Sequence, residues 1–520
     1  MMRTVLVFLT GLLWLSVWAQ EAPDVRPMLQ DVFPVAKVKP GMKGYGLTVF
    51  KGTKIERFEV EVIGVLEQAV AGKPLIMIRA RGGPITERNA MIIGGMSGSP
   101  VFLEGKVLGA IGYGFFFSRE PIGLVTPLEA MLTVFDPRVE AWHPAEPRTV
   151  MKPIQIGGRR YAGVYIGLER PPSPNLAWAR PLMTPVMVRG VSPRLMKPLK
   201  ERLEKFGLTP IMAPAGTTQR PIPVRFEPGA ALGGALATGD IDLTAIGTLT
   251  YRRGNYVLGF GHPFLGAGEV EMPMTAAEIV DVIPTYDISS KIGNRAQVLG
   301  TIYRDEAFAI AGRIGRTPKM LPIRVQVSHL GKGVTRTFRC EVIRHPLFAS
   351  GLAATAVDEF IGRIHYGIGE ASATVRWRLQ TDRFGTIQYQ NRVASNFLLS
   401  SEVVGDLMYA MDLILNAPDV KATIESLEVE VAIAPTYASA FIESLTTDRA
   451  SYRPGERVNA LVRVRPYGAQ DPVSFPVSFR LPADAPPGRY LLRVSAPSQG
   501  MGGGALGLGA ILVQALGGEG

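Results

Sequence analysis

The residues with the clearest chemical potential are a serine and its flanking glycines, in Gly95-Met96-Ser97-Gly98-Ser99-Pro100. Glycines let a backbone turn sharply, present a hydroxyl and bring amide groups close to a ligand. The pattern therefore suits a nucleophilic serine, although Gly and Ser also fill ordinary turns. Ser99 lies in the same turn. We prefer Ser97 as the nucleophile, because the residue after the second glycine usually packs behind it.

His262 is the candidate base. It stands in Gly261-His262-Pro263 directly after the strand-like segment that begins at Tyr256, and a base at a strand end can face a cleft. The alternative is a turn histidine that bonds its own loop. We expect the other four histidines to be surface or structural residues: His143, His329, His345 and His365.

The elements that must position these residues are short. Forty-one prolines and 58 glycines punctuate the chain, and apolar runs alternate with turn residues. We therefore predict a mainly β fold with α+β additions, in which Glu104-Gly105 and Arg252–Asn255 are hairpin turns. The serine motif falls within a segment of residues 20–140 and the histidine within a segment of residues 230–345.

Three further segments have other patterns. Residues 141–229 are predicted to be a proline-rich insert or linker with one helix, capped by Ser192 and stopped by Gly207. Residues 346–440 are predicted to be an α+β module, with helices over 351–360 and 401–415. Residues 441–520 are predicted to form an immunoglobulin-like β-sandwich and a Gly-rich tail.

The first residues predict export. Met1-Met2-Arg3 supplies a positive start, and the apolar run from Val5 to Trp18 is short for a bilayer span. Val17-Trp18-Ala19 offers a cleavage site, so we interpret residues 1–19 as a signal peptide. An uncut membrane anchor is the alternative. Periplasm, cell envelope and full secretion all fit this interpretation.

Composition limits the partners and cofactors. The net charge of +11 is scattered along the chain, which argues against nucleic acid and leaves a peripheral contact with anionic membrane surfaces open. No metal-ligand spacing or nucleotide fingerprint occurs, so we expect no metal and no cofactor. Cys340 is the single cysteine, and we expect it to be a buried, inert thiol. The oligomeric state stays unassigned.

Several segments together resemble the stage IV sporulation protein B peptidase family. The resemblance covers roughly residues 31–135 and 230–330, through Phe33-Pro-Val-Ala-Lys-Val-Lys-Pro-Gly-Met-Lys-Gly, Gly95-Met-Ser-Gly-Ser-Pro-Val, Gly105-Lys-Val-Leu-Gly-Ala, Ala245-Ile-Gly-Thr-Leu-Thr-Tyr and Leu258-Gly-Phe-Gly-His262. In that family the histidine half precedes the serine half, whereas Ser97 precedes His262 here. The resemblance thus implies a permuted, trypsin-like double β-barrel assembled from two separated segments.

The resemblance also implies roles for individual residues. Ser97 would be the nucleophile and His262 its base, and the amides of Gly95 and Ser97 would bind the oxyanion, as the matching amides do in trypsin-like peptidases. The family's aspartate, however, aligns with Gly82.

The third member of the site is therefore open. Glu87, Asp240 or Asp242 could orient the imidazole from another direction, or a backbone carbonyl could do so in a dyad.

Two functions follow from these residues. The first is a serine endopeptidase that cleaves another exported or envelope protein. The second is a catalytically inactive, peptidase-like envelope scaffold, in which the missing aspartate marks lost chemistry and the barrel seam binds a peptide or partner strand.

Overall fold

The computed structural model describes residues 23–115, 118, 120–136, 147–213, 221–286, 288–494 and 511–516. The predicted signal peptide, His143 and most of the Gly-rich tail lie outside these residues. The chain divides into two compact units. The first comprises Met1–Met187, Arg202–Gly234 and Thr244–Pro318, and the second comprises Val188–Glu201, Ala235–Leu243 and Lys319–Gly520.

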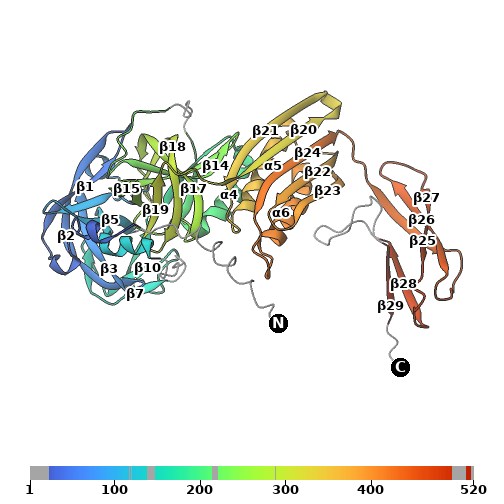
Figure 1. Ribbon diagram of the computed structural model, residues 1–520, viewed down its shortest axis with the longest axis horizontal. Helices are drawn as coiled ribbons and strands as arrows, with labels where there is room; N and C mark the ends of the chain where they lie inside the picture. The colour runs from blue at the N-terminus through green and yellow to red at the C-terminus, as the bar shows by residue number, and fades with distance from the viewer. Residues whose placement is uncertain are drawn as a thin grey trace, which may run out of the picture. The chain divides into compact units, whose positions relative to one another are not determined.

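Six strands of the first unit close into an antiparallel barrel (Figure 1). Their order is β4-β1-β2-β3-β6-β5, and β5 pairs back with β4 to complete the ring. The strands are β1 (Lys43–Val49), β2 (Ile55–Val70), β3 (Lys73–Arg81), β4 (Pro100–Leu103), β5 (Lys106–Phe115) and β6 (Ile122–Pro127).

The alternation of side chains along β2 shows why this barrel forms. Phe58, Val60 and Val62 are buried in its core. The glutamates between them face away from that core, and Glu61 stands opposite Arg79 of β3. Burying every second residue of a strand fixes its register, because a slip of one residue would turn the carboxylates inward.

A second set of six strands follows the same plan. The order is β15-β16-β19-β18-β17-β14, and β14 also pairs with β15. The strands are β14 (Ala231–Gly239), β15 (Asp242–Arg253), β16 (Tyr256–Gly259), β17 (Gly268–Ile283), β18 (Ser290–Glu306) and β19 (Ala309–Ile314). The mainly β expectation is confirmed, whereas the permutation itself stays a prediction.

The predicted insert contains more strand than expected. The strands β11, β10 and β7 continue the first sheet beyond β5, and β8 and β9 form a separate hairpin. These strands are β7 (Arg148–Val150), β8 (Ile154–Ile156), β9 (Arg159–Tyr161), β10 (Gly163–Ile166) and β11 (Leu176–Pro181). Two more, β12 (Thr184–Arg189) and β13 (Leu208–Met212), follow β15 in the second sheet.

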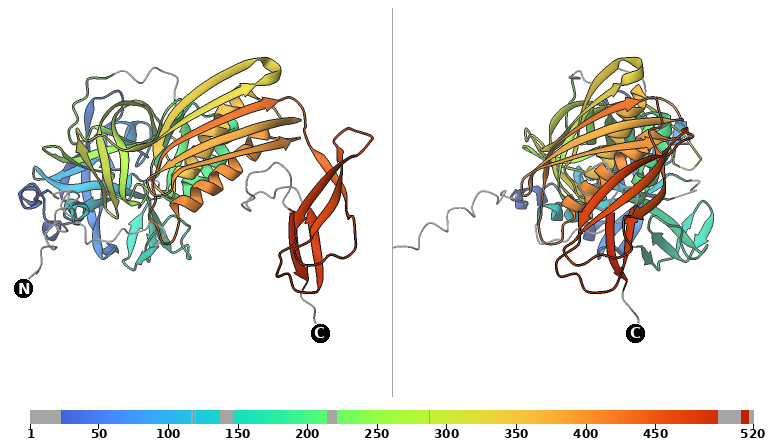
Figure 2. Two further views of the ribbon diagram at one scale, coloured as in Figure 1. Left: turned by 45° about the vertical axis from the view of Figure 1, so that its right-hand side comes forward. Right: turned by 90° about the vertical axis from the view of Figure 1, so that its right-hand side faces the viewer.

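The second unit contains a five-stranded run in the order β21-β20-β24-β22-β23, with α5 and α6 against one face (Figures 1 and 2). The predicted helices are confirmed as α5 (Ala349–Ile364) and α6 (Leu399–Leu415). The strands are β20 (Met320–His329), β21 (Val334–Ile343), β22 (Ala371–Thr381), β23 (Gly385–Ser395) and β24 (Ile424–Ala434).

The helix predicted after Ser192 is α4 (Pro193–Leu203), and it ends through a 3-10 turn at left-handed Gly207, as expected. The predicted cap is wrong in one respect. The Ser192 hydroxyl makes no hydrogen bond to any described residue. Instead, the Ser192 amide donates to Glu359 of α5 at 2.8 Å.

The expected immunoglobulin-like sandwich is not confirmed. The strands β25 (Ala440–Thr447), β26 (Arg457–Pro466) and β27 (Val473–Arg480) form one three-stranded sheet, and β28 (Arg489–Val494) pairs with β29 (Ile511–Leu516). A sandwich buries the facing sides of two sheets. Val458, Ala460 and Val462 of β26 are buried, so part of one face of the three-stranded sheet is covered, whereas Phe441 and Phe475 are exposed.

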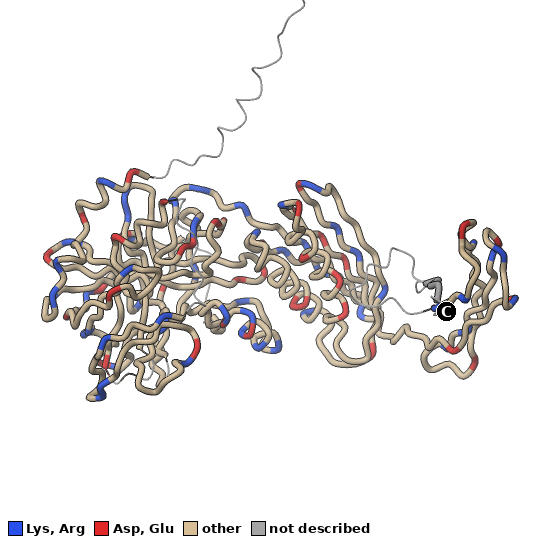
Figure 3. The backbone as a smooth tube through the Cα atoms, turned by 90° about the horizontal axis from the view of Figure 1, so that it is seen from below, with Lys and Arg blue, Asp and Glu red and all other residues tan. Residues whose placement is uncertain are grey.

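Two composition-based expectations can be compared with the structure. Lys and Arg are interspersed with Asp and Glu along the described chain (Figure 3), in agreement with a scattered charge. Cys340 is free and buried, and burial raises the pKa of its thiol to about 12, as expected for an inert cysteine. None of the described helices has the length and apolar content needed to span a membrane.

We predict that Phe360→Ala destabilises the second unit by about 3–5 kcal/mol. Phe360 is fully buried on α5, and its ring stacks on Phe338 of β21 at a centroid distance of 4.7 Å. Calorimetric melting should show the loss. Tyr366→Ala is the control, because Tyr366 is exposed and its loss should cost no more than about 0.5 kcal/mol. Equal effects of the two changes would contradict this packing.

Candidate functional site

The serine turn lies between the short helix α2 (Pro84–Glu87) and β4, and its shape requires glycine. Gly95 and Gly98 have φ values of 91° and 92°, a region that side chains disfavour. A Cβ on Gly98 would lie 2.0 Å from the Thr248 carbonyl oxygen of β15. The turn can therefore pack on β15 only with a glycine at this position.

The amides of this turn fall into two groups. Those of Met96, Gly98 and Ser99 donate to carbonyl groups of the backbone. Those of Gly95 and Ser97 donate to no acceptor among the described residues. The two amides that the family resemblance assigns to the oxyanion are thus the two left unpaired, and unpaired donors in a buried turn can stabilise a developing negative charge.

Ser97 itself is closed off from solvent. Its side chain has 0% exposure, and its hydroxyl has no hydrogen-bond partner among the described residues. A buried hydroxyl without a partner costs about 1–3 kcal/mol, so its presence calls for an explanation.

His262 has a similar environment. It is 2% exposed, and its Nε2 also lacks a partner among the described residues. Its Nδ1 lies 2.7 Å from the Pro263 carbonyl oxygen. A carbonyl can only accept, so Nδ1 must carry the proton and Nε2 must carry the free electron pair. Burial lowers the pKa of His262 to about 4, which keeps the ring neutral at neutral pH.

The loop that carries His262 has a strained backbone at Phe260 and is anchored by hydrogen bonds to a buried carboxylate. Phe260 adopts a φ of 69°, which is rare for a bulky side chain. The carboxylate of Asp305 on β18 accepts the amides of Phe264 at 2.8 Å and Leu265 at 2.5 Å. Burial raises the pKa of Asp305 to about 6. Asp305 therefore anchors the loop, a role that sequence reasoning missed because one aspartate in a strand has no distinguishing pattern.

Glycines allow the histidine loop to pack directly on the serine half. A Cβ on Gly98 would lie 2.5 Å from the Phe260 amide nitrogen, and one on Gly112 of β5 would lie 2.3 Å from the Gly261 carbonyl oxygen. That carbonyl accepts the Thr126 hydroxyl of β6 at 2.5 Å. The predicted meeting of the two distant segments is therefore found, although no hydrogen bond joins the Ser97 and His262 side chains.

Tyr113 of β5 is a third unpaired polar group in this region. It is fully buried, its hydroxyl has no partner among the described residues, and its ring meets that of His262 edge-on at 6.4 Å. Phe260 contacts the imidazole in the same way at 6.1 Å. Sequence reasoning missed Tyr113, because a tyrosine in an apolar strand normally indicates core packing.

None of the carboxylates considered for the third position bonds the His262 imidazole. Glu87 is exposed at the end of α2. Asp240 and Asp242 belong to the second unit, where the Asp240 carboxylate accepts the Arg339 amide at 2.7 Å. The one partner of the imidazole among the described residues is the Pro263 carbonyl, which is the backbone alternative.

Of the other histidines, three are described, and all belong to the second unit. Nε2 of His329 lies 3.4 Å from Nδ1 of His365, and Nδ1 of His345 accepts the Leu347 amide. His329 and His345 have local partners, as expected for structural residues.

A buried hydroxyl cluster lies behind the serine turn. The Ser99 hydroxyl donates to Thr48 Oγ1 of β1 at 3.1 Å, and Thr48 Oγ1 lies 2.7 Å from Nζ of Lys291 on β18. Thr248 donates to the Gly95 carbonyl at 3.0 Å. The Ser99 hydroxyl is thus bonded within this cluster, whereas the Ser97 hydroxyl has no described partner, and the choice of Ser97 as nucleophile stays a prediction. Lys291 was missed, because its fully buried amine cannot be foreseen from a lysine in an ordinary strand.

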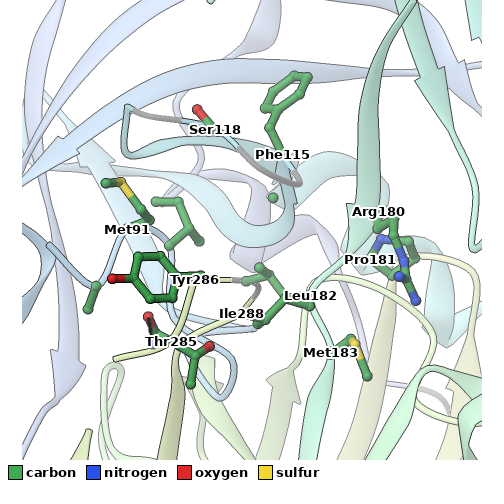
Figure 4. Close-up of a pocket in the computed structure, with 14 residues that line it drawn as sticks. Met91, Phe115, Ser118, Arg180, Pro181, Leu182, Met183, Thr285, Tyr286 and Ile288 are labelled. Carbon is green, nitrogen blue, oxygen red and sulfur yellow. Dashed lines mark hydrogen bonds between the residues drawn. The ribbon is translucent and has the colours of Figure 1, made fainter. Parts of the chain in front are cut away.

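A pocket of the first unit is lined in part by residues 90–92, which precede the serine turn in the chain. Figure 4 shows its lining, in which apolar side chains such as Met91 and Leu182 stand together with the polar side chains of Ser118, Arg180 and Thr285. The surface that the pocket exposes is more polar than apolar. It thus offers both kinds of contact to a ligand near the serine turn.

No group of three or more metal-ligating side chains occurs among the described residues. The candidate site brings a hydroxyl, an imidazole and two backbone amides onto segments that pack together. These are the groups that acyl transfer to a serine uses.

Residues 20–132 match the family model described as SpoIVB peptidase S55. The resemblance suspected from the sequence is therefore confirmed for the serine half, and at family level it indicates a peptidase. No curated protein matches the chain, and no solved structure matches it. The matched residues include the whole serine turn and exclude His262.

We predict that Gly112→Ala destabilises the first unit by about 1–3 kcal/mol, because its Cβ would collide with the Gly261 carbonyl. Gly64→Ala in β2 is a matched control, since its Cβ would meet nothing within 4 Å. Urea unfolding should separate the two variants. Identical midpoints would mean that the histidine loop does not pack closely on β5.

Proposed function

We propose that this chain is an exported serine endopeptidase that cleaves another exported or envelope protein. The observation that carries the proposal is the pair of buried, unpartnered atoms, Ser97 Oγ and His262 Nε2, on segments that pack against each other. Burying two polar atoms without partners is costly, and such groups gather at functional sites, where a reacting ligand supplies the missing contacts.

The proposed reaction begins with attack on a peptide carbonyl. Ser97 Oγ bonds to the carbonyl carbon while its proton moves to His262 Nε2. The carbonyl oxygen becomes an oxyanion that accepts hydrogen bonds from the Gly95 and Ser97 amides. As the tetrahedral intermediate collapses, His262 gives the proton to the leaving amine. Water then releases the acyl group from Ser97 by the same steps in reverse.

The Pro263 carbonyl takes the place of the usual carboxylate in this proposal. It accepts the Nδ1 proton at 2.7 Å, which selects the tautomer and orients the ring. A neutral carbonyl stabilises an imidazolium less than a carboxylate does. Loss of the carboxylate in a serine triad costs about 10⁴ in turnover, so we expect a slow enzyme.

Burial of Ser97 limits turnover further. A peptide can reach a hydroxyl with 0% exposure only through local opening of the site. The pocket that residues 90–92 line is the proposed binding place for a substrate side chain. Export rests on the pattern of Met1 to Ala19.

The inactive envelope scaffold is the second candidate. It is favoured by the closed position of Ser97 together with Gly82 at the place of the family's aspartate. In this version the same pocket binds a peptide that is not cleaved.

We predict that a fluorophosphonate probe labels the wild-type protein at Ser97. Ser97→Ala should abolish this label, and His262→Ala should slow labelling by about 10²-fold or more, the usual contribution of a general base. Peptide mass spectrometry locates the label. Ser444→Ala, an exposed serine on β25, is the matched control and should label as the wild type does. Wild-type protein that stays unlabelled would favour the scaffold.

A further inference from the structure

Lys291 is the most unusual residue near the serine turn. It is completely buried on β18, and its backbone amide donates to the Gly94 carbonyl at 2.9 Å. Its aliphatic stem lies over Gly95, where an added Cβ would meet Lys291 carbons at 3.2 Å. The main chain of Lys291 therefore bonds the residue before Gly95, and its side chain lies over Gly95 itself, whose amide is assigned to the oxyanion.

The backbone contact fixes a direction. In a trans peptide the carbonyl and the following N–H point to opposite sides. Because the Gly94 carbonyl points at the Lys291 amide, the Gly95 N–H points away from β18. Lys291 thus holds the donor in the orientation that leaves it unpaired.

The amine of Lys291 has no counter-charge among the described residues. Its one described partner is Thr48 Oγ1 at 2.7 Å. The neighbouring strands carry other charged groups, none of which forms an ion pair with Lys291: Glu269, Glu271, Glu278 and Asp281 on β17, Lys43 on β1 with Lys51 after it, and Arg313 on β19. Burial alone lowers the pKa of Lys291 to about 7.

The number of acceptors around Nζ also favours a neutral amine. Thr48 Oγ1, at 2.7 Å, is the one described acceptor within hydrogen-bond reach of Nζ. An ammonium group has three protons to donate, so at least two of them would lack a described acceptor. The neutral amine has one donor fewer and carries no charge, so it fits this buried position better.

A buried lysine without an anion also lowers stability. Its folded pKa lies below its unfolded value of 10.5, so the unfolded state binds more protons between about pH 7 and 10.5. The cost is full below pH 7 and fades as the pH rises towards 10.5. A residue that costs stability at a functional turn is explained by a role in that turn.

We propose that Lys291 is a positioning residue of the serine turn, which holds the Gly95 amide ready for the oxyanion while neutral and disables the turn when it is protonated. This inference rests on the proposed peptidase function. Protonation would place a charge without a described counter-ion at the end of a side chain whose stem packs on Gly95. Hydrolysis at Ser97 should therefore fail below neutral pH, well before His262 is protonated near pH 4.

The test compares fluorophosphonate labelling of Ser97 between pH 5.5 and 8 in matched variants. The rate of wild-type labelling should fall about 30-fold when the pH is lowered from 8 to 5.5, because the neutral fraction of a group with a pKa of about 7 falls by that factor. Lys291→Met keeps an unbranched stem and removes the charge, so the labelling rate of this variant should differ by less than about twofold between pH 5.5 and pH 8. Lys73→Met, an exposed lysine on β3, should follow the wild type.

Two further measurements separate positioning from simple packing. Thr48→Val should slow labelling at pH 8, and Thr48→Ser, which keeps the hydroxyl, should restore it. Lys291→Met should also melt at a higher temperature than the wild type, by a margin that is larger at pH 5.5 than at pH 9.

The outcomes are distinguishable. Wild-type protein that is labelled at Ser97 with no change in rate between pH 5.5 and 8 would overturn the role of Lys291 and leave the peptidase intact. The role of Lys291 would also be overturned if the labelling rate of Lys291→Met still fell 30-fold between pH 8 and pH 5.5. It would likewise be overturned if the gain in melting temperature of this variant were the same at both pH values. Wild-type protein that is unlabelled at every pH would overturn the peptidase and, with it, the switch.

Discussion

The packing of the first unit depends on the close approach of two backbone segments that are far apart in the sequence. The segment Phe260–His262 lies so near Gly98 and Gly112 that a single added carbon at either glycine would overlap it. Protein interiors tolerate such overlap poorly, because they are already packed as tightly as crystals. The glycines of the serine turn thus do more than shape a loop. Together with Gly112 of β5, they let the loop that carries His262 pack directly on the part of the chain that carries Ser97.

A low dielectric is the second consequence of this packing. His262, Lys291 and Asp305 all lie in the interior of the first unit, and burial shifts the pKa of each towards its uncharged form. The same environment would strengthen every interaction with a charge that forms during a reaction. Two unpaired amides in such surroundings are a stronger oxyanion site than two amides in water.

Replacement of a carboxylate by a carbonyl fits this environment. A buried aspartate beside His262 would itself need compensation for lost solvation, whereas the Pro263 carbonyl orients the ring at little electrostatic cost. The structure therefore assigns the loop carboxylate, Asp305, to the backbone of the histidine loop rather than to its ring. The proposed enzyme would stabilise its transition state less than an enzyme with a carboxylate does, but it avoids a buried charge beside His262.

The sequence by itself determined the mainly β fold, the two long helices of the second unit and the serine turn with its two candidate amides. These features depend on local rules of periodicity, turn chemistry and glycine content, and each is encoded within a few neighbouring residues. Only the tertiary structure decided what surrounds the site. The Pro263 carbonyl as partner of His262, the anchoring role of Asp305 and the buried amine of Lys291 depend on contacts between residues far apart in the chain. The burial that shifts their pKa values is a property of the assembled core, and no single segment carries it.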